Sequence, residues 1–201
     1  MWHAEPGGII AIVPLKALNA AKGRLATVVD PEGRRRVVGR MLRAVLSACR
    51  ACGSVTDVLV VAGDEAAARL AIAAGARALV EPEPGLDAAM AAADAATVQA
   101  RATLVVAADL PLATGADLDR VFAAAPGRDA VVVVAPTRDG GTGALLRRPP
   151  GVIVTTYGPG SAAAHLRGAA AEGVRGIRVE VAGLAHDVDT PAHLTAELLG
   201  P

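Results

Sequence analysis

Apolar positions along the chain follow two alternating patterns. Short β-branched runs are typical of strands buried on both faces of a parallel sheet, and longer stretches with a repeat near 3.6 residues are typical of helices packed on such a sheet. Strands are predicted at Ile9–Val13, Asp57–Ala62, Arg77–Val80, Thr103–Ala108 and Asp129–Ala135, with shorter ones near Ala144–Arg147, Val152–Thr155 and Ile177–Val181. Helices are predicted from the N-cap Asp30 to Gly53, and at Glu65–Ala74, Leu86–Ala100, Gly115–Ala125, Ser161–Glu172 and Pro191–Leu199.

This alternation of strands and helices predicts an α/β fold built from βαβ units around a mostly parallel sheet. The segment Pro136–Gly160, rich in proline and glycine, interrupts the alternation and predicts a small hairpin insertion. No repeat or shift in composition marks a domain boundary. We therefore expect residues 1–201 to form a single domain, with residues 1–8 flexible.

Composition narrows the classes of function. The chain has 201 residues, 53% of them apolar, and a net charge of zero, so neither a nucleic-acid polymer nor an anionic membrane is an expected partner. No apolar run reaches the roughly 18 residues of a membrane span, and the N-terminus lacks the features of a signal peptide. Cys49 and Cys52 have the spacing of a redox or zinc half-site, but no second pair follows, which favours structural burial. We expect a cytoplasmic protein.

Three cations follow the first predicted strand, at Lys16, Lys22 and Arg24. Ligands of open α/β sheets bind beyond the carboxyl ends of the strands, so this loop faces the expected crevice. A polyanion such as the phosphate chain of a nucleotide is the natural ligand for three cations. The loop is therefore the candidate nucleotide site.

Carboxylates stand at two further places of this kind. Asp109 follows a fully apolar strand, where an uncompensated carboxylate is costly, and a divalent cation is one reason to place it there. Asp187 and Asp189 are two residues apart, so both face one side of an extended segment. Such hard oxygen ligands suit Mg²⁺. The alternatives are that Asp109 or Asp189 caps a helix and that Asp187 is simply solvated.

Two glycine-rich segments could bind anions. Gly158 to Ser161 precedes a predicted helix with Ser161 as the expected N-cap, and helix N-termini attract anions. Gly140 to Gly143 could form a second backbone anion site, although both segments could equally be ordinary turns. Neither is a phosphate-binding Walker loop, since no Gly-Lys-Ser/Thr follows. His165, one turn into the same helix, either contacts an anion or packs in the core.

Six motifs occur in an order that resembles one known family. They are Pro14-Leu15-Lys16, Ala21-Lys22-x-Arg24-Leu25, Asp109-Leu110-Pro111, Gly141-Thr142-x-Ala144-Leu145, Gly158-x-x-Ser161 with His165, and Asp187-Val188-Asp189-Thr190-Pro191. The sequence resembles the 2-phospholactate / phosphoenolpyruvate guanylyltransferase family of coenzyme F-420 biosynthesis, from about Ile9 to Leu199.

The resemblance implies a three-layer, Rossmann-like nucleotidyltransferase fold of the GT-A type, shared with molybdenum-cofactor guanylyltransferase. It implies GTP, Mg²⁺ and a phosphorylated three-carbon acid as ligands, with phosphoenolpyruvate the expected acid and 2-phospho-L-lactate the other. By this resemblance Lys16, Lys22 and Asp109 are catalytic, and Asp109, Asp187 and Asp189 bind the metal. It assigns the nucleotide to Pro14, Leu15, Lys16, Lys22, Arg24 and Asp87, and the acid to Thr142, Gly158 and Ser161.

Two positions depart from the family pattern. Gly143 and Asp87 stand where the family usually has asparagine. Two rival functions stay open: a sugar-phosphate or molybdenum-cofactor nucleotidyltransferase, whose glycine-rich loop is missing after the first strand, and a non-catalytic GTP-binding module. We expect a monomer or a homodimer.

Overall fold

The structure, a computed structural model, describes residues 4–18, 28–81, 83 and 85–188. Lys22, Arg24, Asp189 and the expected helix Pro191–Leu199 lie outside these residues. The elements in chain order are β1 (Ile9–Leu15), α1 (Pro31–Ala51), β2 (Asp57–Ala62), α2 (Glu65–Ala73), β3 (Arg77–Val80), α3 (Leu86–Thr97), β4 (Ala102–Val106), α4 (Gly115–Ala123), β5 (Val131–Pro136), β6 (Thr142–Arg148), α5 (Ser161–Ala171), β7 (Arg175–Arg178) and the short 3₁₀ helix η2 (Ala182–Leu184).

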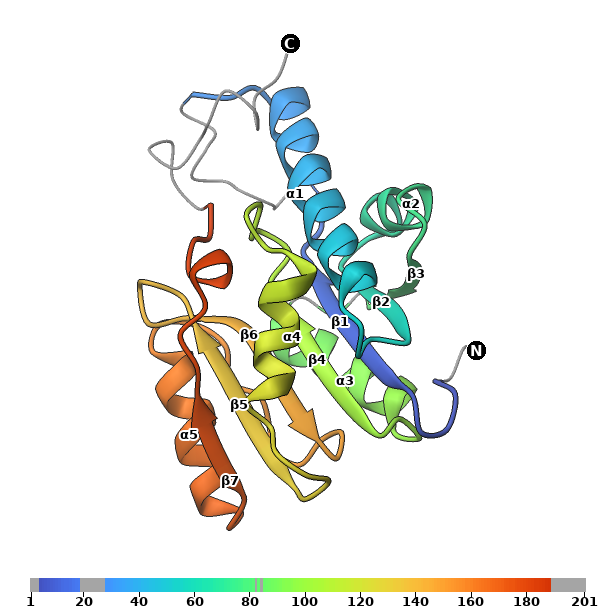
Figure 1. The fold of residues 1–201 in the computed structure, drawn as a ribbon. Helices are drawn as coiled ribbons and strands as arrows, with labels where there is room; N and C mark the ends of the chain where they lie inside the picture. Colours follow the sequence, from blue (N-terminus) through green and yellow to red (C-terminus); the bar gives the residue numbers. More distant parts are fainter. Residues whose placement is uncertain (1–3, 19–27, 82, 84, 189–201) are drawn as a thin grey trace.

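A seven-stranded sheet with the order β3-β2-β1-β4-β6-β5-β7 forms the centre of the molecule (Figure 1). β1 pairs in parallel with β2 and β4, and β5 pairs in parallel with β7. β6 is antiparallel to both of its neighbours, β4 and β5. The expected mostly parallel sheet is confirmed. The observed hairpin pairs β6, which lies in the predicted segment Pro136–Gly160, with β5, which ends at Pro136, and β6 lies inside the sheet between β4 and β5.

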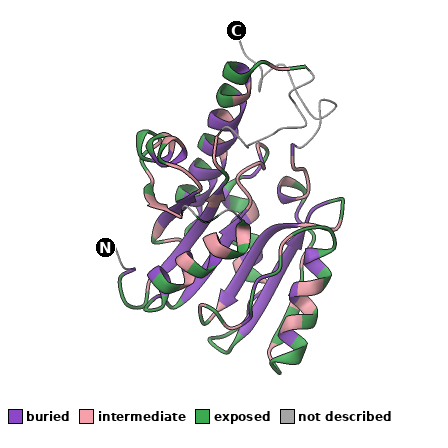
Figure 2. Ribbon diagram, turned by 180° about the vertical axis from the view of Figure 1, so that it is seen from behind, coloured by how far each residue is buried: buried purple, intermediate pink, exposed green. Residues whose placement is uncertain are grey.

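Helices cover both faces of the sheet, which gives the three expected layers. Alternate residues of β1 divide the core: Ile9, Ala11, Val13 and Leu15 join the cluster that includes the buried sides of α1, α2 and α4. Ile10 and Ile12 join the cluster on the opposite face, with α3 and α5. The strands at the centre are buried almost throughout (Figure 2), as their unbroken apolar runs predict.

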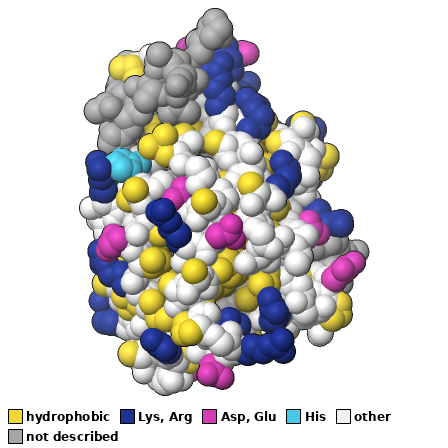
Figure 3. Space-filling view, in the orientation of Figure 1, with side chains coloured by type: hydrophobic (Ala, Val, Ile, Leu, Met, Phe, Trp, Pro, Cys, Tyr) yellow, Lys and Arg dark blue, Asp and Glu magenta, His cyan; other side chains and the backbone are white. Residues whose placement is uncertain are grey.

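The start of α1 follows the expected capping signal. The Asp30 carboxylate accepts a hydrogen bond from the Gly33 N–H at 2.6 Å, and Pro31 opens the helix. Arg35 and Arg36 are exposed and Arg34 is half-buried, and basic side chains gather along this helix (Figure 3). Cys49 and Cys52 are buried as expected, and burial raises the pKa of the Cys49 thiol to about 12. This thiol is therefore protonated and unreactive at neutral pH.

The structure corrects two expectations about local structure. No strand forms at Val152–Thr155: Ile153 is buried, but Val154 is 88% exposed, because the segment lies in the loop between β6 and α5. Residues 4–8, expected to be flexible, are held against the end of α3. The Ala4 N–H donates to the Ala96 carbonyl at 3.1 Å, the Gly7 N–H donates to the Gln99 carbonyl at 3.1 Å, and Ala4 is buried.

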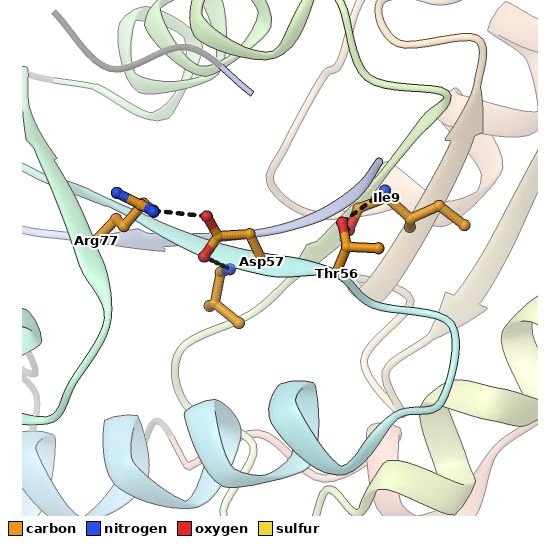
Figure 4. Close-up of polar contacts among 5 residues, drawn as sticks. Ile9, Thr56, Asp57 and Arg77 are labelled. Carbon is orange, nitrogen blue, oxygen red and sulfur yellow. Dashed lines mark hydrogen bonds and ion pairs between the residues drawn. The ribbon is translucent and has the colours of Figure 1, made fainter. Parts of the chain in front are cut away.

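The amino edge of the sheet is occupied by polar groups that bind one another (Figure 4). The Thr56 hydroxyl lies 3.0 Å from both the N–H and the carbonyl oxygen of Ile9, and Asp57 forms a 2.6 Å ion pair with Arg77. An open pocket of about 180 Å³ lies beside these residues. Because ligands of such sheets bind beyond the carboxyl ends of the parallel strands, the active site is expected at the opposite edge.

Candidate active site

Lys16 and Asp109 lie at the same edge of the sheet. Lys16 follows the last residue of β1 and its side chain is exposed, while Asp109 comes three residues after the end of β4. β1 and β4 are parallel neighbours, so their carboxyl ends meet. This arrangement brings Lys16, a candidate phosphate-binding cation, and Asp109, a predicted metal ligand, to the same edge of the expected crevice.

The first residues of the basic loop are fixed by the neighbouring strand β2. The Gly63 N–H donates to the Leu15 carbonyl at 2.9 Å, and the Asp64 carboxylate accepts the Leu18 N–H at 3.1 Å. The second Asp64 oxygen caps α2 through the Ala67 N–H at 2.7 Å. Sequence reasoning missed Asp64 as an anchor of this loop. Its position as the N-cap before Glu65 was the available signal.

The other described residues that were predicted to bind the nucleotide differ in where they lie. The Leu15 side chain points into the core beside α1, so this position offers no side chain to a ligand. Pro14 is half-buried on the opposite face of β1. Asp87 is exposed in the first turn of α3, the helix that follows β3 and therefore begins at the same sheet edge.

The segments that carry Asp109 and Asp187 are joined by a backbone hydrogen bond. The Val188 N–H donates to the Asp109 carbonyl at 3.1 Å, so the segment that carries Asp187 lies against the end of β4. Both aspartates are half-buried, and the adjacent Leu110 and Val188 are buried and hold the two segments in place. Asp109 does not cap α4, because Thr114 does so through a capping box with Asp117.

The donor set fits a hard divalent cation. Mg²⁺ in phosphate-transfer sites is held by one or two carboxylates together with substrate phosphates, and Asp109 and Asp187 supply two carboxylates. Within the described residues no cluster of three histidine, cysteine, aspartate or glutamate side chains forms. The third predicted ligand, Asp189, lies just beyond them.

Gly143 fits the segment of Asp187 closely against the sheet. A Cβ at this position would overlap the carbonyl oxygen of Leu184 in η2. The Gly143 carbonyl in turn accepts the Ala107 N–H at 2.9 Å, and the Arg138 N–H donates to the Ala185 carbonyl at 3.0 Å. The β5–β6 hairpin, the end of β4 and the segment 182–188 therefore form one unit. The missing asparagine of the family pattern is explained here by close backbone approach.

Replacing Gly143 with alanine is expected to lower the free energy of unfolding by about 1–3 kcal/mol, because the methyl group must displace the Leu184 carbonyl. Urea unfolding measures this change. Gly53→Ala is the matched control, since a Cβ there meets only Asp119 Oδ1 at 3.9 Å. Equal stability of the two variants would contradict the close approach.

The two glycine segments meet, as a shared anion site would require. The Ala162 N–H in the first turn of α5 donates to the Gly140 carbonyl at 3.3 Å. The Ser161 N–H donates to the Gly158 carbonyl at 3.1 Å, so these two amide groups are already engaged. Asp139, which sequence reasoning also missed, shapes the first segment by accepting from the Thr137 hydroxyl at 2.5 Å and the Gly141 N–H at 3.0 Å. These hydrogen bonds lower the pKa of Asp139.

Ser161 is not the N-cap that the sequence predicted. Gly160, with a φ of 73°, occupies the N-cap position, and Ser161 is the first helical residue. A left-handed cap suits glycine, and it frees the Ser161 hydroxyl to turn inward. Ser161 Oγ lies 2.8 Å from the Oγ1 atom of Thr142, which is the first residue of β6. Thr142 and Ser161, two residues expected to bind the acid, are thus in contact, and Gly158 adjoins them with a φ of 130°.

The sequence matches the family described as "Guanylyl transferase CofC like" over residues 9–199. This match covers nearly all of the chain. The chain belongs to this family. It is 39% identical over 194 residues to a phosphoenolpyruvate guanylyltransferase of Sphaerobacter thermophilus, with 95% of this chain and 92% of the relative aligned. It is 36% identical over 197 residues to a 3-phospho-D-glycerate guanylyltransferase of Phenylobacterium zucineum, with 95% and 90% aligned.

The fold is similar to solved nucleotidyltransferase structures. A 4-diphosphocytidyl-2C-methyl-D-erythritol synthase from Anaerococcus prevotii superimposes with a TM-score of 0.63 at 10% identity, covering 92% of each chain. At this identity the likeness concerns the fold alone. The expected nucleotidyltransferase fold is thereby confirmed, and the guanylyltransferase family expected from the six motifs is confirmed by the family match.

Proposed function

We propose that the chain transfers GMP from GTP to a phosphorylated three-carbon acid and releases pyrophosphate, as a step of coenzyme F-420 biosynthesis. Phosphoenolpyruvate is the expected acid, and 2-phospho-L-lactate and 3-phosphoglycerate are the alternatives. One observation carries the proposal. A single sheet edge presents Lys16, the Asp109–Asp187 pair and the Thr142–Ser161 hydroxyls. These are a cation for phosphates, carboxylates for a metal and a pair of hydroxyls for a small second substrate.

The chemistry needs no protein nucleophile. An oxygen of the acid's phosphate attacks the α-phosphorus of GTP, a new P–O bond forms, and the bond from the α-phosphorus to the bridging oxygen breaks. That oxygen leaves with the electron pair as part of pyrophosphate. The attacking phosphate monoester is already anionic at neutral pH, so no general base is needed. The protein has to hold two anions close together, so it must neutralise their charges and position them for the reaction.

In the proposed site, Lys16, Lys22 and Arg24 neutralise the triphosphate, and Asp87 contacts the base or ribose. Asp109, Asp187 and Asp189 hold Mg²⁺, with the buried Leu110 and Val188 fixing the first two. When bound, the metal adds positive charge beside the phosphate oxygens.

The acid is proposed to lie against Thr142, Gly158 and Ser161. The hydroxyl pair of Thr142 and Ser161 can donate to a carboxylate or phosphate oxygen of the acid. Gly158 leaves open space beside them, since nothing lies within 4 Å of a Cβ built there. The relatives' names include both phosphoenolpyruvate and 3-phospho-D-glycerate at similar identity, so the choice of acid needs an assay.

Two rival functions lose support. A sugar-phosphate or molybdenum-cofactor transferase would be expected to match another family, and a GTP-binding module without activity would not need the paired carboxylates. No helix of the described residues is long and apolar enough to cross a membrane. The cytoplasmic location, the single domain and the oligomeric state stay predictions.

The test is release of pyrophosphate from GTP with each acid. The purified chain, GTP and Mg²⁺ are incubated separately with phosphoenolpyruvate, 2-phospho-L-lactate and 3-phosphoglycerate. We expect release that requires GTP and one acid, that ATP does not replace, and that a chelator of Mg²⁺ stops. Absence of release with all three acids, despite GTP binding, would overturn the proposal.

A further inference from the structure

His165 lies behind the two hydroxyls and is 1% exposed in α5. Both of its ring nitrogens have a partner. Nε2 lies 3.1 Å from the Thr156 backbone nitrogen, and Nδ1 lies 3.2 Å from Thr142 Oγ1. A backbone N–H can only donate, so Nε2 must be the accepting, unprotonated nitrogen. The neutral ring then carries its proton on Nδ1 and donates it to Thr142.

The surroundings keep this ring neutral. Burial, and to a smaller extent the positive charge of the fully buried Arg147 on β6, together lower the pKa of His165 to about 4. The ring of Tyr157, from the loop before α5, packs edge-on against the imidazole with centroids 5.0 Å apart. The tautomer set by Thr156 is thus the form present at physiological pH.

The hydroxyl pair of Thr142 and Ser161 has one proton left to donate to a ligand. Thr142 Oγ1 accepts the Nδ1–H of His165, and one of the two hydroxyls donates to the other across 2.8 Å. Two hydroxyls hold two protons, and this mutual bond uses one. One O–H therefore remains to donate to a ligand, and both oxygens are held in place by the ring behind them.

We infer that His165 is a positioning residue that fixes the Thr142–Ser161 pair so that it presents one O–H donor to an oxygen of the anionic acid. The inference rests on the proposed function and adds a residue to it. Without the Nδ1–H donor, Thr142 could turn its own proton towards residue 165. The pair would then lose its fixed direction and the acid would bind less well, whereas GTP would be unaffected.

Two substitutions separate the ring nitrogens. His165→Asn places an amide N–H near the position of Nδ1 and keeps the donor to Thr142, whereas His165→Gln reaches the position of Nε2 and keeps the acceptor for Thr156. We expect His165→Gln to raise the KM for the acid about tenfold, the effect of losing one hydrogen bond to a charged group. The KM for GTP should stay within about twofold, and His165→Asn should stay near the wild type in both constants.

Equal effects of the two substitutions on the acid, or an equal rise in the KM for GTP, would overturn the inference in favour of a purely structural role. A second measurement is independent of the acid. Two-bond ¹H–¹⁵N NMR of the wild type at pH 7, assigned by the signals missing in His165→Gln, should show a neutral ring protonated on Nδ1. Protonation on Nε2, or a charged ring, would also overturn it.

Failure of the proposed function gives a different result. In that case the wild-type chain releases no pyrophosphate with any acid, and the assignment of the acid to this pocket fails with it. A wild type that turns over normally while His165→Gln leaves the KM for its acid unchanged would overturn the role of His165 alone.

Discussion

Replacing Asp109 with asparagine is expected to lower the rate of pyrophosphate release by about a hundredfold to a thousandfold. Asparagine keeps the shape of the side chain but removes its charge, so the proposed metal site loses one of its two described carboxylates. The backbone bond from Val188 to Asp109 does not depend on the side chain and should persist. Turnover at saturating GTP and acid measures the effect, and thermal unfolding checks that the fold is intact.

Asp57→Asn is the matched control for this substitution. Asp57 begins β2 at the opposite edge of the sheet, where it forms a partly exposed ion pair with Arg77. Such pairs contribute at most about 1 kcal/mol to stability, and we expect turnover to be unchanged. A rate for Asp109→Asn as high as that of this control would remove Asp109 from the reaction.

Replacing Asp94 with asparagine is expected to have the largest effect on stability, a loss of about 2–4 kcal/mol. Asp94 on α3 forms a two-pronged ion pair with Arg147, with distances of 2.9 Å and 2.5 Å. The Arg147 side chain is completely buried and that of Asp94 is 32% exposed, so removing the carboxylate leaves a buried charge without its counter-ion. Urea unfolding at pH 7 measures the change.

Glu180→Gln provides the comparison, because Arg178 and Glu180 form an ion pair of 2.6 Å with both side chains exposed. The loss there should stay below about 1 kcal/mol. Replacing Asp94 and Arg147 together with leucine and methionine should recover most of the stability, since a buried ion pair contributes little beyond an apolar pair of the same size. Similar losses for Asp94→Asn and Glu180→Gln would contradict the burial argument.

Local signals in the sequence were sufficient for most of the fold. The strand β2 was predicted at its observed bounds, because an apolar run between turn signals is a property of the run itself. β1 extends to Leu15 beyond the predicted Val13, because Pro14 and Leu15 still pair with Val61 and Ala62 of β2. Pairing with a distant strand cannot be read from the run alone.

The position of β6 had the same limitation. A hairpin was expected, but the place of β6 between β4 and β5 depends on pairing with the distant strand β4, in which Thr103 pairs with Arg147. Val152–Thr155 shows the opposite error. Its apolar residues predict a strand, yet Ile153 and Thr155 are buried and Val154 is exposed in a segment that pairs with no described strand.

For the candidate site, the sequence indicated residue types and sheet edges but not contacts. Asp109, Asp187 and Asp189 were predicted together as metal ligands, and the hydrogen bond from Val188 to Asp109 places the segment of Asp187 beside the end of β4. The link between Thr142, Ser161 and His165 could not be predicted, because it requires the Gly160 cap that turns Ser161 inward.

The reversal of β6 has a consequence for how this enzyme family could diversify. Because β6 runs backwards between β4 and β5, its first residue lies at the same edge as the last residues of its neighbours. Thr142, Gly158 and Ser161, which are proposed to hold the acid, and the positioning residue His165 therefore lie within one stretch of the chain, whereas the residues proposed for GTP lie at the end of β1, in the segment after it and at the start of α3. A change of acid preference would need substitutions only within residues 142–165, and the residues proposed for GTP could remain constant while this segment evolves.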